Sequence, residues 1–211
     1  MNSPEKNSFD SIIRHYFTPD QLAKIRRTHI GIAGAGGLGS NCAHALVRCG
    51  FEKFTIVDFD VIEPSNLNRQ FYFPDQIGRP KVEALKENLR RINPEITIKT
   101  FQIKLDRGNM PLLFDPCQVI VEAFDKAEMK AAIVECFANS DKFMVTASGL
   151  AGYGKSDRIK SKKLRANLIL IGDGRSSVSE TLKPLAPCVY IAAAKQADAV
   201  LEWTLQSALS P

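Results

Sequence analysis

The stretch "HIGIAGAGGLGS", His29 to Ser40, decides the fold. Its first half is an apolar run that glycine stops, which predicts a buried strand, and Leu38 to Cys49 has the apolar spacing of a helix. Between them, Gly34, Gly36 and Gly39 fit the pattern G-x-G-x-x-G. In this pattern the first glycine permits a tight turn, the second lets the backbone approach phosphate oxygens, and the third lets strand and helix pack closely. The stretch therefore predicts a strand, a phosphate-binding loop and a helix.

Strand and helix patterns continue to alternate from this loop to residue 150. Strands are expected at 53–60, 95–103, 117–124 and 142–150, and helices at 78–94 and 126–140. Alternation of this kind requires a parallel sheet with right-handed crossovers and helices on both faces. We therefore expect an α/β, Rossmann-like and mostly parallel sheet.

The two ends of the chain depart from this alternation. Thr18, Pro19 and Gln21 predict the start of a helix, so residues 1–28 should form one or two short N-terminal helices. After residue 150, the stretch 158–173 predicts two short strands that form a small antiparallel extension, and 186–206 predicts a final helix. We expect a single domain over 1–211, with N-terminal helices (1–28), a nucleotide-binding core (29–150) and an extension with the final helix (151–211).

The composition is typical of a water-soluble globular protein, with 45% apolar and 24% charged residues in 211. The net charge of +5 is modest, and its densest basic run, 158–165, is interpreted as a solvated edge strand or, alternatively, as a docking patch for an acidic partner or nucleic acid. No charged and apolar leader opens the chain, and no apolar run is long enough to span a membrane. We expect a cytoplasmic protein.

The cysteines and histidines suggest no metal or catalytic cluster. Five cysteines without C-x-x-C spacing indicate neither a disulfide framework nor a zinc site, and Cys42, Cys49 and Cys117 are expected to be core thiols. The three histidines (His15, His29 and His44) show no catalytic arrangement.

Polar residues beyond the loop indicate a nucleotide. Asp58 lies 24 residues after Gly34, at the end of the second expected strand, where a carboxylate can accept hydrogen bonds from ribose hydroxyls. Arg69 and Lys81 supply two cations that suit a triphosphate better than the pyrophosphate of a dinucleotide, and Asn66 can donate to phosphate or help to hold a hydrated metal. Each of these residues could instead be an ordinary surface or capping group.

Asp125 ends another expected strand, so it should lie at the same edge of the sheet as the loop. A carboxylate that faces phosphates there is a natural Mg²⁺ ligand. The competing interpretation is that Asp125 caps the helix that begins at Lys126.

Four motifs occur in a characteristic order: "GAGGLGS", "VDFDVIEPSNLNRQ", "IGRPK" and "RINPEI". With them the chain resembles the adenylation domain shared by ThiF, MoeB and the ubiquitin-activating enzymes, and most of all the short bacterial ThiF proteins. The resemblance covers about Ser8 to Leu150 and is weaker in the last third. It implies ATP-dependent adenylation of the C-terminal Gly-Gly carboxylate of a ubiquitin-like sulfur carrier protein (ThiS-like), which gives an acyl-adenylate and pyrophosphate, for the thiazole of thiamine.

The resemblance also implies roles for individual residues. Arg14 would reach into the site of a second subunit, so a homodimer is expected. Asp125 would bind Mg²⁺. The remaining expected nucleotide contacts are Gly34, Gly36, Gly37 and Gly39 in the loop, Asp58 on the ribose, and Asn66, Arg69 and Lys81 on the phosphates.

The cysteines depart from the family pattern, and several alternative functions are possible. Longer relatives carry two C-x-x-C pairs, which this chain lacks, so no zinc is expected, and Cys188 is the only candidate for thiol chemistry. Other activated carboxylates are possible, namely the molybdopterin synthase small subunit or tRNA threonylcarbamoyladenosine. A catalytically silent subunit that binds a ubiquitin-like protein, and an NAD-dependent oxidoreductase, are further alternatives. No membrane partner is expected, and nucleic acid is not favoured.

Overall fold

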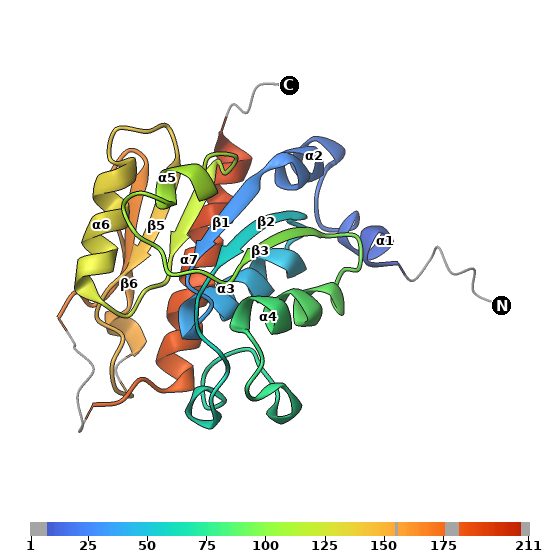
Figure 1. Ribbon diagram of the computed structural model, residues 1–211. Coiled ribbons are helices and arrows are strands. Elements are labelled where there is room, and N and C mark those ends of the chain that lie inside the picture. Colours follow the sequence, from blue (N-terminus) through green and yellow to red (C-terminus); the bar gives the residue numbers. More distant parts are fainter. Residues whose placement is uncertain (1–7, 155, 176–181, 208–211) are drawn as a thin grey trace.

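A computed structural model describes residues 8–154, 156–175 and 182–207. A seven-stranded sheet forms its centre, in the order β3-β2-β1-β4-β5-β7-β6 (Figure 1). The strands are β1 (His29–Ala33), β2 (Lys53–Val57), β3 (Thr97–Phe101), β4 (Val119–Glu122), β5 (Phe143–Ala147), β6 (Lys160–Arg165) and β7 (Leu168–Gly172). The helices are α1 (Phe9–Ile13), α2 (Pro19–Arg27), α3 (Gly37–Arg48), α4 (Lys81–Arg90), α5 (Met110–Leu113), α6 (Ala127–Phe137) and α7 (Ala186–Gln206), with short 3₁₀ turns η2 (Pro64–Asn66), η3 (Pro74–Gln76) and η4 (Ser156–Arg158).

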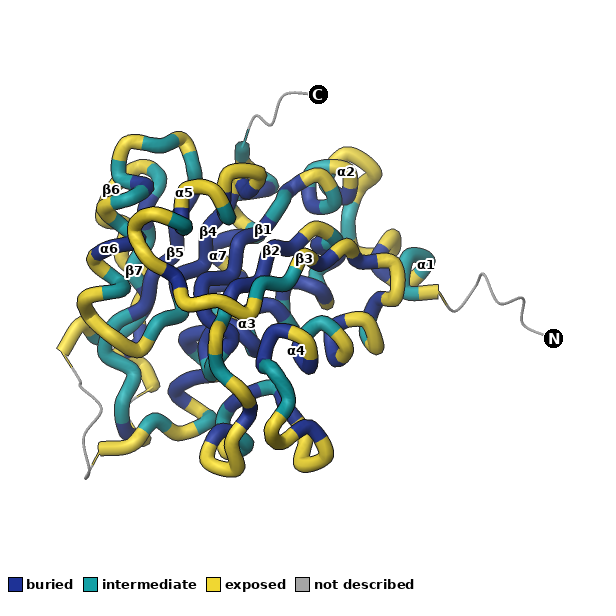
Figure 2. The backbone as a smooth tube through the Cα atoms, viewed as in Figure 1, coloured by how far each residue is buried: buried dark blue, intermediate teal, exposed yellow. Residues whose placement is uncertain are grey.

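The helices cover both faces of the sheet, as the alternating pattern predicts. On β4, Val119 and Val121 face a core built with α3, α4 and α7, whereas Ile120 faces a second core built with α5 and α6. This alternation follows from the period of two along a strand. Central strands buried on both faces are the dark interior of Figure 2. The α/β, Rossmann-like fold is thus confirmed.

The strand directions refine the expected antiparallel extension. β1 pairs in parallel with β2 and β4, β2 with β3, and β4 with β5. β7 also runs parallel to β5, and only β6 is antiparallel, paired with β7 at the edge of the sheet. All six residues of β6 are exposed, as expected for a solvated edge strand.

The N-terminal segment forms the two short helices that were expected. Thr18 and Gln21 make the capping box at the start of α2, with Pro19 in the first turn. The Nζ of Lys24 on α2 donates to the backbone oxygens of Leu205 (3.1 Å) and Ser207 (2.8 Å), at the carboxyl end of α7. These bonds attach the N-terminal segment to the last helix.

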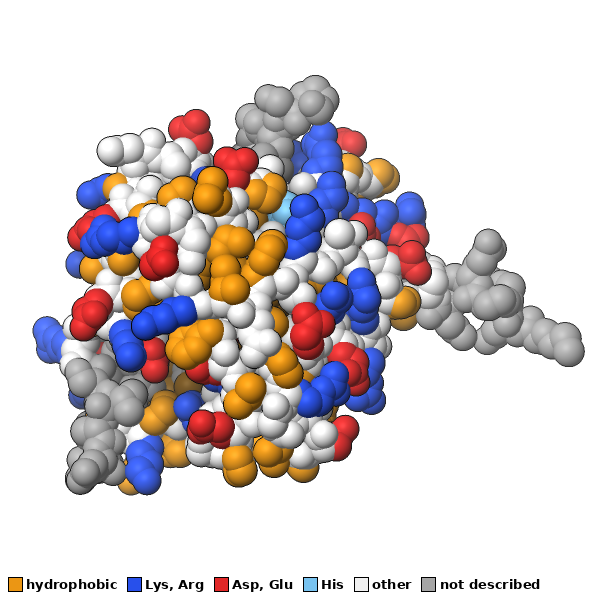
Figure 3. Space-filling model, viewed as in Figure 1, with side chains coloured by type: hydrophobic (Ala, Val, Ile, Leu, Met, Phe, Trp, Pro, Cys, Tyr) orange, Lys and Arg blue, Asp and Glu red, His pale blue; other side chains and the backbone are white. Residues whose placement is uncertain are grey.

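Some sequence expectations need adjustment. Cys42 and Cys117 are buried, but Cys49 is only half-buried. On the face shown in Figure 3, basic and acidic side chains are interspersed, which fits the modest net charge. Among the described residues, no helix is both long enough and apolar enough to cross a membrane.

Candidate nucleotide-binding site

The loop between β1 and α3 has the backbone that the glycine pattern predicts. Gly34 has a φ of +102°, and a Cβ there would lie 2.9 Å from the backbone oxygen of Ala123. A Cβ on Gly39 would lie 1.8 Å from the Gly34 oxygen, so only glycine lets α3 approach this turn. The turn at Gly34 and the close packing at Gly39 are as predicted.

The other two glycines of the loop differ from each other. Gly36 is the N-cap of α3 and offers no side-chain cap, and a Cβ on it would meet only the Nε2 of Gln70, at 3.9 Å. No side chain caps the first N–H groups of α3 among the described residues, an arrangement that attracts anions. A Cβ on Gly37, however, would lie 2.9 Å from Cγ1 of Val189 on α7, so Gly37 is required for helix packing rather than only for close approach of a ligand.

Asp58 directly follows β2 and lies against the glycine loop. Its Oδ2 accepts a hydrogen bond from the Ala35 N–H (2.6 Å), and its Oδ1 accepts one from the Asp60 N–H (2.8 Å). Burial raises the pKa of the Asp58 carboxyl above its ordinary value of 3.8, and the two N–H donors partly oppose that rise. A carboxylate oxygen has two acceptor sites, so Asp58 retains capacity for ribose hydroxyls.

The loop from 58 to 80 is fastened onto α3 and the glycine loop. The Tyr72 hydroxyl donates to the Ala35 oxygen (2.7 Å). Asn41 Nδ2 on α3 donates to the Arg69 oxygen (2.8 Å), and Ser40 Oγ accepts from the Phe71 N–H (3.0 Å). These bonds bring residues 69–72 to the start of α3.

Arg69 is a half-buried cation at the start of α3. A Cβ on Gly37 would lie 3.5 Å from Arg69 Cγ, which places the stem of Arg69 beside the helix terminus. Its Nη1 donates to the backbone oxygen of Ser65 (3.1 Å) and to Oδ1 of Asn68 (2.7 Å), and it forms no ion pair within the described part of the chain. Burial lowers the pKa of the Arg69 guanidinium, yet an arginine remains charged. A cation without a protein counter-charge, beside free helix N–H groups, suits a phosphate.

Lys81 begins α4, and its nearest anion in this structure is Asp60. The Lys81 Nζ donates to Asp60 Oδ2 (2.7 Å), and the Lys81 side chain is only 7% exposed. The Lys81 N–H also donates to the Asp60 oxygen (3.0 Å). An ammonium has three donors, so two remain for a ligand.

Asn66 is buried and has a local role. Its Oδ1 accepts a hydrogen bond from the Glu63 N–H (3.2 Å), and its Nδ2 lies 3.4 Å from Ser65 Oγ. The amide thus shapes the turn η2, and only its Nδ2 is weakly engaged. The expected contact of Asn66 with phosphate stays a prediction.

Asp125 lies in the exposed turn between β4 and α6. The N-cap of α6 is Lys126 and receives no side-chain bond, so Asp125 does not cap this helix. In the described ranges Asp125 forms no hydrogen bond or ion pair, and no group of three or more His, Cys, Asp or Glu could hold a metal ion. An unengaged single carboxylate fits Mg²⁺, which often takes one or two carboxylates and completes its shell with nucleotide oxygens and water.

Arg14 ends α1, at the edge of the molecule beside α2 (Figure 1). Its Nε donates to Asp10 Oδ2 (2.7 Å), and Asp10 also pairs with Arg26. Within the described chain Arg14 contacts none of the loop residues, so any role at the nucleotide requires a second copy of the protein.

Two polar residues of the same stretch were not assigned a role from the sequence alone. Gln70 is 6% exposed, its Nε2 points toward Gly36, and its Oε1 has no partner among the described residues. Asp60 is the partner of Lys81. The signal for both was present in the quoted run "VDFDVIEPSNLNRQ", but only the folded loop shows which of them face the site.

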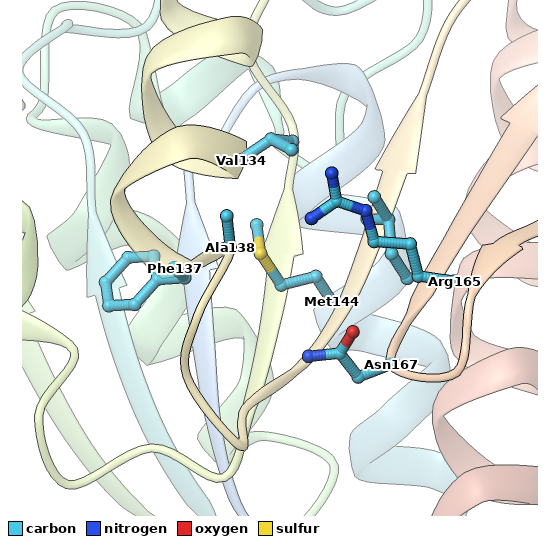
Figure 4. A pocket seen from close by; sticks show the side chains of 7 residues that line it. Val134, Phe137, Ala138, Met144, Arg165 and Asn167 are labelled. Carbon is cyan, nitrogen blue, oxygen red and sulfur yellow. The ribbon is translucent and has the colours of Figure 1, made fainter.

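A cavity of about 150 Å³ lies beyond the carboxyl ends of β5 and β7. Its lining includes Gly149–Tyr153, Arg158, Ile159, Asp173, Leu182 and Cys188. Cys188 is buried in the first turn of α7 and faces this space. A second hollow of about 10 Å³ lies at the amino end of β5, beside Met144, Arg165 and Asn167, and has room for about one water (Figure 4).

The model of the ThiF family matches residues 10–209. The chain belongs to the ThiF family. The ThiF-family relatives include the tRNA threonylcarbamoyladenosine dehydratase of Haemophilus influenzae, 33% identical over 147 residues, which cover 69% of this chain and 56% of that protein. Another is the adenylyltransferase and sulfurtransferase UBA4 of Eremothecium gossypii, 35% identical over 63% of this chain and 30% of that protein. The match thus spans about half or less of each relative's length.

Solved structures confirm the fold. The E. coli tRNA threonylcarbamoyladenosine dehydratase TcdA, solved with AMP, superimposes with a TM-score of 0.84 at 20% identity, over 92% of each chain. E. coli MccB, solved with ATP, gives a TM-score of 0.71 at 21% identity over 95% of this chain and 64% of the other. At these identities the likeness establishes the ThiF-type fold.

Proposed function

We propose that this protein uses ATP to adenylate a carboxylate, and that the carboxylate is the C-terminal Gly-Gly end of a ubiquitin-like sulfur carrier of the ThiS type, for the thiazole of thiamine. The observation that carries the proposal is the grouping of Arg69, Lys81 and Asp58 around the uncapped start of α3. Membership in the ThiF family supports it.

The chemistry explains why these groups are needed. A carboxylate oxygen of the carrier attacks the α-phosphorus of ATP, the bond from that phosphorus to the bridging oxygen breaks, and pyrophosphate leaves with the bonding electron pair. Nucleophile and phosphates are both anionic and repel each other, so cations must neutralise charge and hold the ends in line. No general base is required, because the carrier carboxylate is already ionised at neutral pH.

Each residue then has a role in binding or orientation. The N–H groups at the start of α3 and Arg69 hold phosphate oxygens, Lys81 adds a point charge from α4, and Asp58 accepts from the ribose. Asp125 would hold Mg²⁺, which neutralises phosphate charge when bound. Arg14 of a second copy would complete the site, which makes a homodimer with two composite sites part of the proposal.

The cavity next to the carboxyl end of β5 provides room for the tail of the carrier. Its wall includes Gly149 and Gly152, both with positive φ, so the backbone curves tightly there. A Gly-Gly tail has no side chains and fits a narrow space. The extension that follows residue 150 is therefore the proposed carrier-binding region.

A second candidate is activation of the carboxylate of threonylcarbamoyladenosine in tRNA. It is favoured by the similarity to the Haemophilus influenzae dehydratase, which covers 69% of this chain. The two candidates share the nucleotide site and differ only in what brings the carboxylate.

Exchange of labelled pyrophosphate into ATP tests the proposal. We expect exchange only when a carrier with an intact Gly-Gly end is added, and its loss, by at least about 100-fold, in Arg69→Ala and Lys81→Ala. Lys86→Ala removes another lysine of α4 and serves as the matched control, with unchanged exchange. Exchange that depends on threonylcarbamoyladenosine tRNA, and not on a carrier, would replace the first candidate with the second. Exchange with neither would contradict both.

A further inference from the structure

Glu122, the last residue of β4, is a fully buried acid at the rim of the nucleotide site. Its Oε1 accepts hydrogen bonds from the Phe124 N–H (2.6 Å) and from Lys130 Nζ (2.8 Å). Its Oε2 accepts from Thr146 Oγ1 (2.5 Å) and from the Ala147 N–H (3.3 Å). A buried charge is costly unless it is paired and fully hydrogen-bonded, and here both oxygens have two donors each.

The two oxygens of Glu122 hold two different parts of the rim. Oε1 holds Phe124, immediately before Asp125, and Lys130, in the second turn of the helix that follows Asp125. Oε2 holds Thr146 and Ala147, at the end of β5, directly before the segment from Gly149 that lines the larger cavity. One carboxylate therefore joins the segment that carries Asp125 to the end of β5, which leads into the wall of the cavity.

Asp125 depends on these neighbours for its position. It is exposed and makes no hydrogen bond or ion pair among the described residues, so its carboxylate is placed by the segments on either side of it. α7 supports the same point, because Gln196 Nε2 donates to the Glu122 backbone oxygen (2.9 Å). Residues that orient a metal ligand without touching the metal commonly alter metal affinity strongly.

We propose that Glu122, through Lys130 and Thr146, is a positioning residue that holds Asp125 and the cavity wall after β5 in the relative positions that adenylation requires. The proposal rests on the proposed function, because it assigns Asp125 to Mg²⁺ and the cavity to the tail of the substrate. Glu122 itself touches neither. The two halves of its bonding are separable, so the two sides of the reaction should respond to different substitutions.

Two substitutions test the halves separately. Lys130→Met removes the hydrogen bond from Lys130 to Glu122, on the side of Asp125. We expect the Mg²⁺ concentration for half-maximal pyrophosphate exchange to rise about 10-fold or more. The KM for the carrier should be nearly unchanged. Thr146→Val keeps the side-chain shape and removes the bond on the β5 side, and we expect a higher carrier KM with unchanged Mg²⁺ dependence. Glu128→Gln, which changes an exposed acid in the first turn of α6, is the control and should alter neither.

A further variant and a second measurement guard against simple destabilisation. Lys130→Met leaves a buried carboxylate without its cation, so the double variant Glu122→Gln/Lys130→Met removes that charge and should keep the altered Mg²⁺ dependence in a stable protein. Lys130→Arg should restore the normal Mg²⁺ dependence. Amide hydrogen exchange measures the segment without any activity, and Phe124 should exchange about 10-fold faster in Lys130→Met than in the wild type.

The results separate this inference from the proposed function. A wild type without pyrophosphate exchange would overturn the proposed function alone, and the Phe124 amide would still decide whether Glu122 and Lys130 hold the segment. An active wild type whose Lys130→Met and Thr146→Val variants lose stability, yet keep the same Mg²⁺ dependence and carrier KM, would overturn the inference. Unchanged exchange of the Phe124 amide would overturn it as well.

Discussion

At the scale of single residues, the glycines of the loop have separable tasks. Gly39 is needed for packing, whereas Gly36 borders open space at the helix start. The roles of both glycines were expected from the spacing of the motif. The tight turn, the approach of phosphate to the backbone, and the packing of helix against strand each require a glycine at a fixed position. What the spacing could not reveal is that Gly37 meets Val189, because that contact joins residues 152 positions apart in the chain.

Alanine at these two glycines should therefore give different results. Gly39→Ala places a Cβ 1.8 Å from the Gly34 oxygen and should lower the free energy of unfolding by about 3 kcal/mol. Gly36→Ala should leave that free energy nearly unchanged but weaken ATP binding, because the Cβ would stand where phosphate approaches. Urea unfolding and calorimetric ATP titration measure the two effects. Full ATP affinity in a folded Gly36→Ala protein would contradict this assignment.

His44 gives a residue-scale prediction for pH. Its Nε2 accepts a hydrogen bond from Arg48 Nε (2.8 Å), which requires a neutral ring, and burial lowers its pKa below the ordinary 6.5. The unfolded chain thus takes up a proton first as pH falls, so stability should decrease as pH passes below about 6.5. The ring is half-exposed, so the loss should be under about 1 kcal/mol. His44→Gln should show a smaller loss of stability between about pH 7.5 and 5.5 in urea unfolding. Equal losses would refute the role of His44.

Only some residues of the candidate site could be predicted from the sequence. Asp58, Arg69 and Lys81 are predicted to bind one nucleotide; the structure places Asp58 against Ala35 and Arg69 beside Gly37, whereas Lys81 pairs with Asp60, and their roles stay predictions. The partnership of Lys81 with Asp60 and the burial of Gln70 were not predicted, since both depend on how an irregular loop of more than 20 residues folds back on α3. Irregular backbone has no periodicity from which orientation can be inferred.

At the scale of elements, long amphipathic segments were the most predictable. The final helix has the expected bounds, Ala186–Gln206, and every expected strand exists, although most are shorter than their apolar runs. The four-residue helix α5 was not predicted, because one turn with a proline leaves no apolar period. The parallel pairing of β7 with β5 was not predicted either, because it depends on how the chain crosses between the two strands and not on the sequence of β7.

The edge strand β6 presents basic side chains on both of its faces, and none of them has an ion pair in the described part of the chain. If an acidic surface of the carrier docks there, Lys160→Glu/Lys162→Glu/Lys163→Glu should weaken carrier binding at low salt, with a smaller effect at high salt. Binding can be measured by calorimetry at two salt concentrations. Lys99→Glu/Lys104→Glu, near the opposite edge of the sheet, is the control.

The outcome for β6 distinguishes three roles. Carrier binding that is unchanged by the triple substitution, at either salt concentration, would leave β6 as a solvated edge whose lysines only oppose edge-to-edge pairing. Loss of tRNA binding with unchanged carrier binding would favour the second candidate function.

The contact between α2 and α7 gives a second prediction at this scale. Lys24 Nζ satisfies two backbone oxygens at the end of α7, where a cation is also favoured by the helix dipole. Lys24→Met should lower the free energy of unfolding by about 1–2 kcal/mol. Lys104→Met, an exposed lysine whose side chain makes no hydrogen bond in the described ranges, should change it little. Urea unfolding with no difference between the two variants would show that the cap is unimportant.

At the scale of the whole molecule, Arg14 is the proposed third cation of the nucleotide site. The Arg14 Nε donates to Asp10, and its terminal nitrogens make no hydrogen bond or ion pair within the described residues. The resemblance to the ThiF family predicted action on a partner subunit. The proposed composite site takes Arg14 from a second copy of the protein, so it requires a dimer.

Mixing two inactive variants tests the dimer directly. Arg14→Ala and Lys81→Ala should each abolish exchange, but a hybrid dimer has one site that lacks both residues and one that is complete. After random reassociation, about a quarter of the wild-type sites should be active. As a control for changes in the N-terminal segment, Asp20→Ala replaces Arg14→Ala in the same mixing experiment. No recovery on mixing, with dimers present, would contradict action in trans.

In the proposed function, the glycine loop, Asp58, Arg69 and Lys81 form one pocket for ATP. A crystal structure of the protein with Mg²⁺ and a non-hydrolysable ATP analogue tests it most directly. We expect the triphosphate across the start of α3, the ribose hydroxyls on Asp58, and Arg69 and Lys81 in contact with phosphate oxygens. A bound nucleotide with Arg69 and Lys81 directed away from its phosphates would contradict the account.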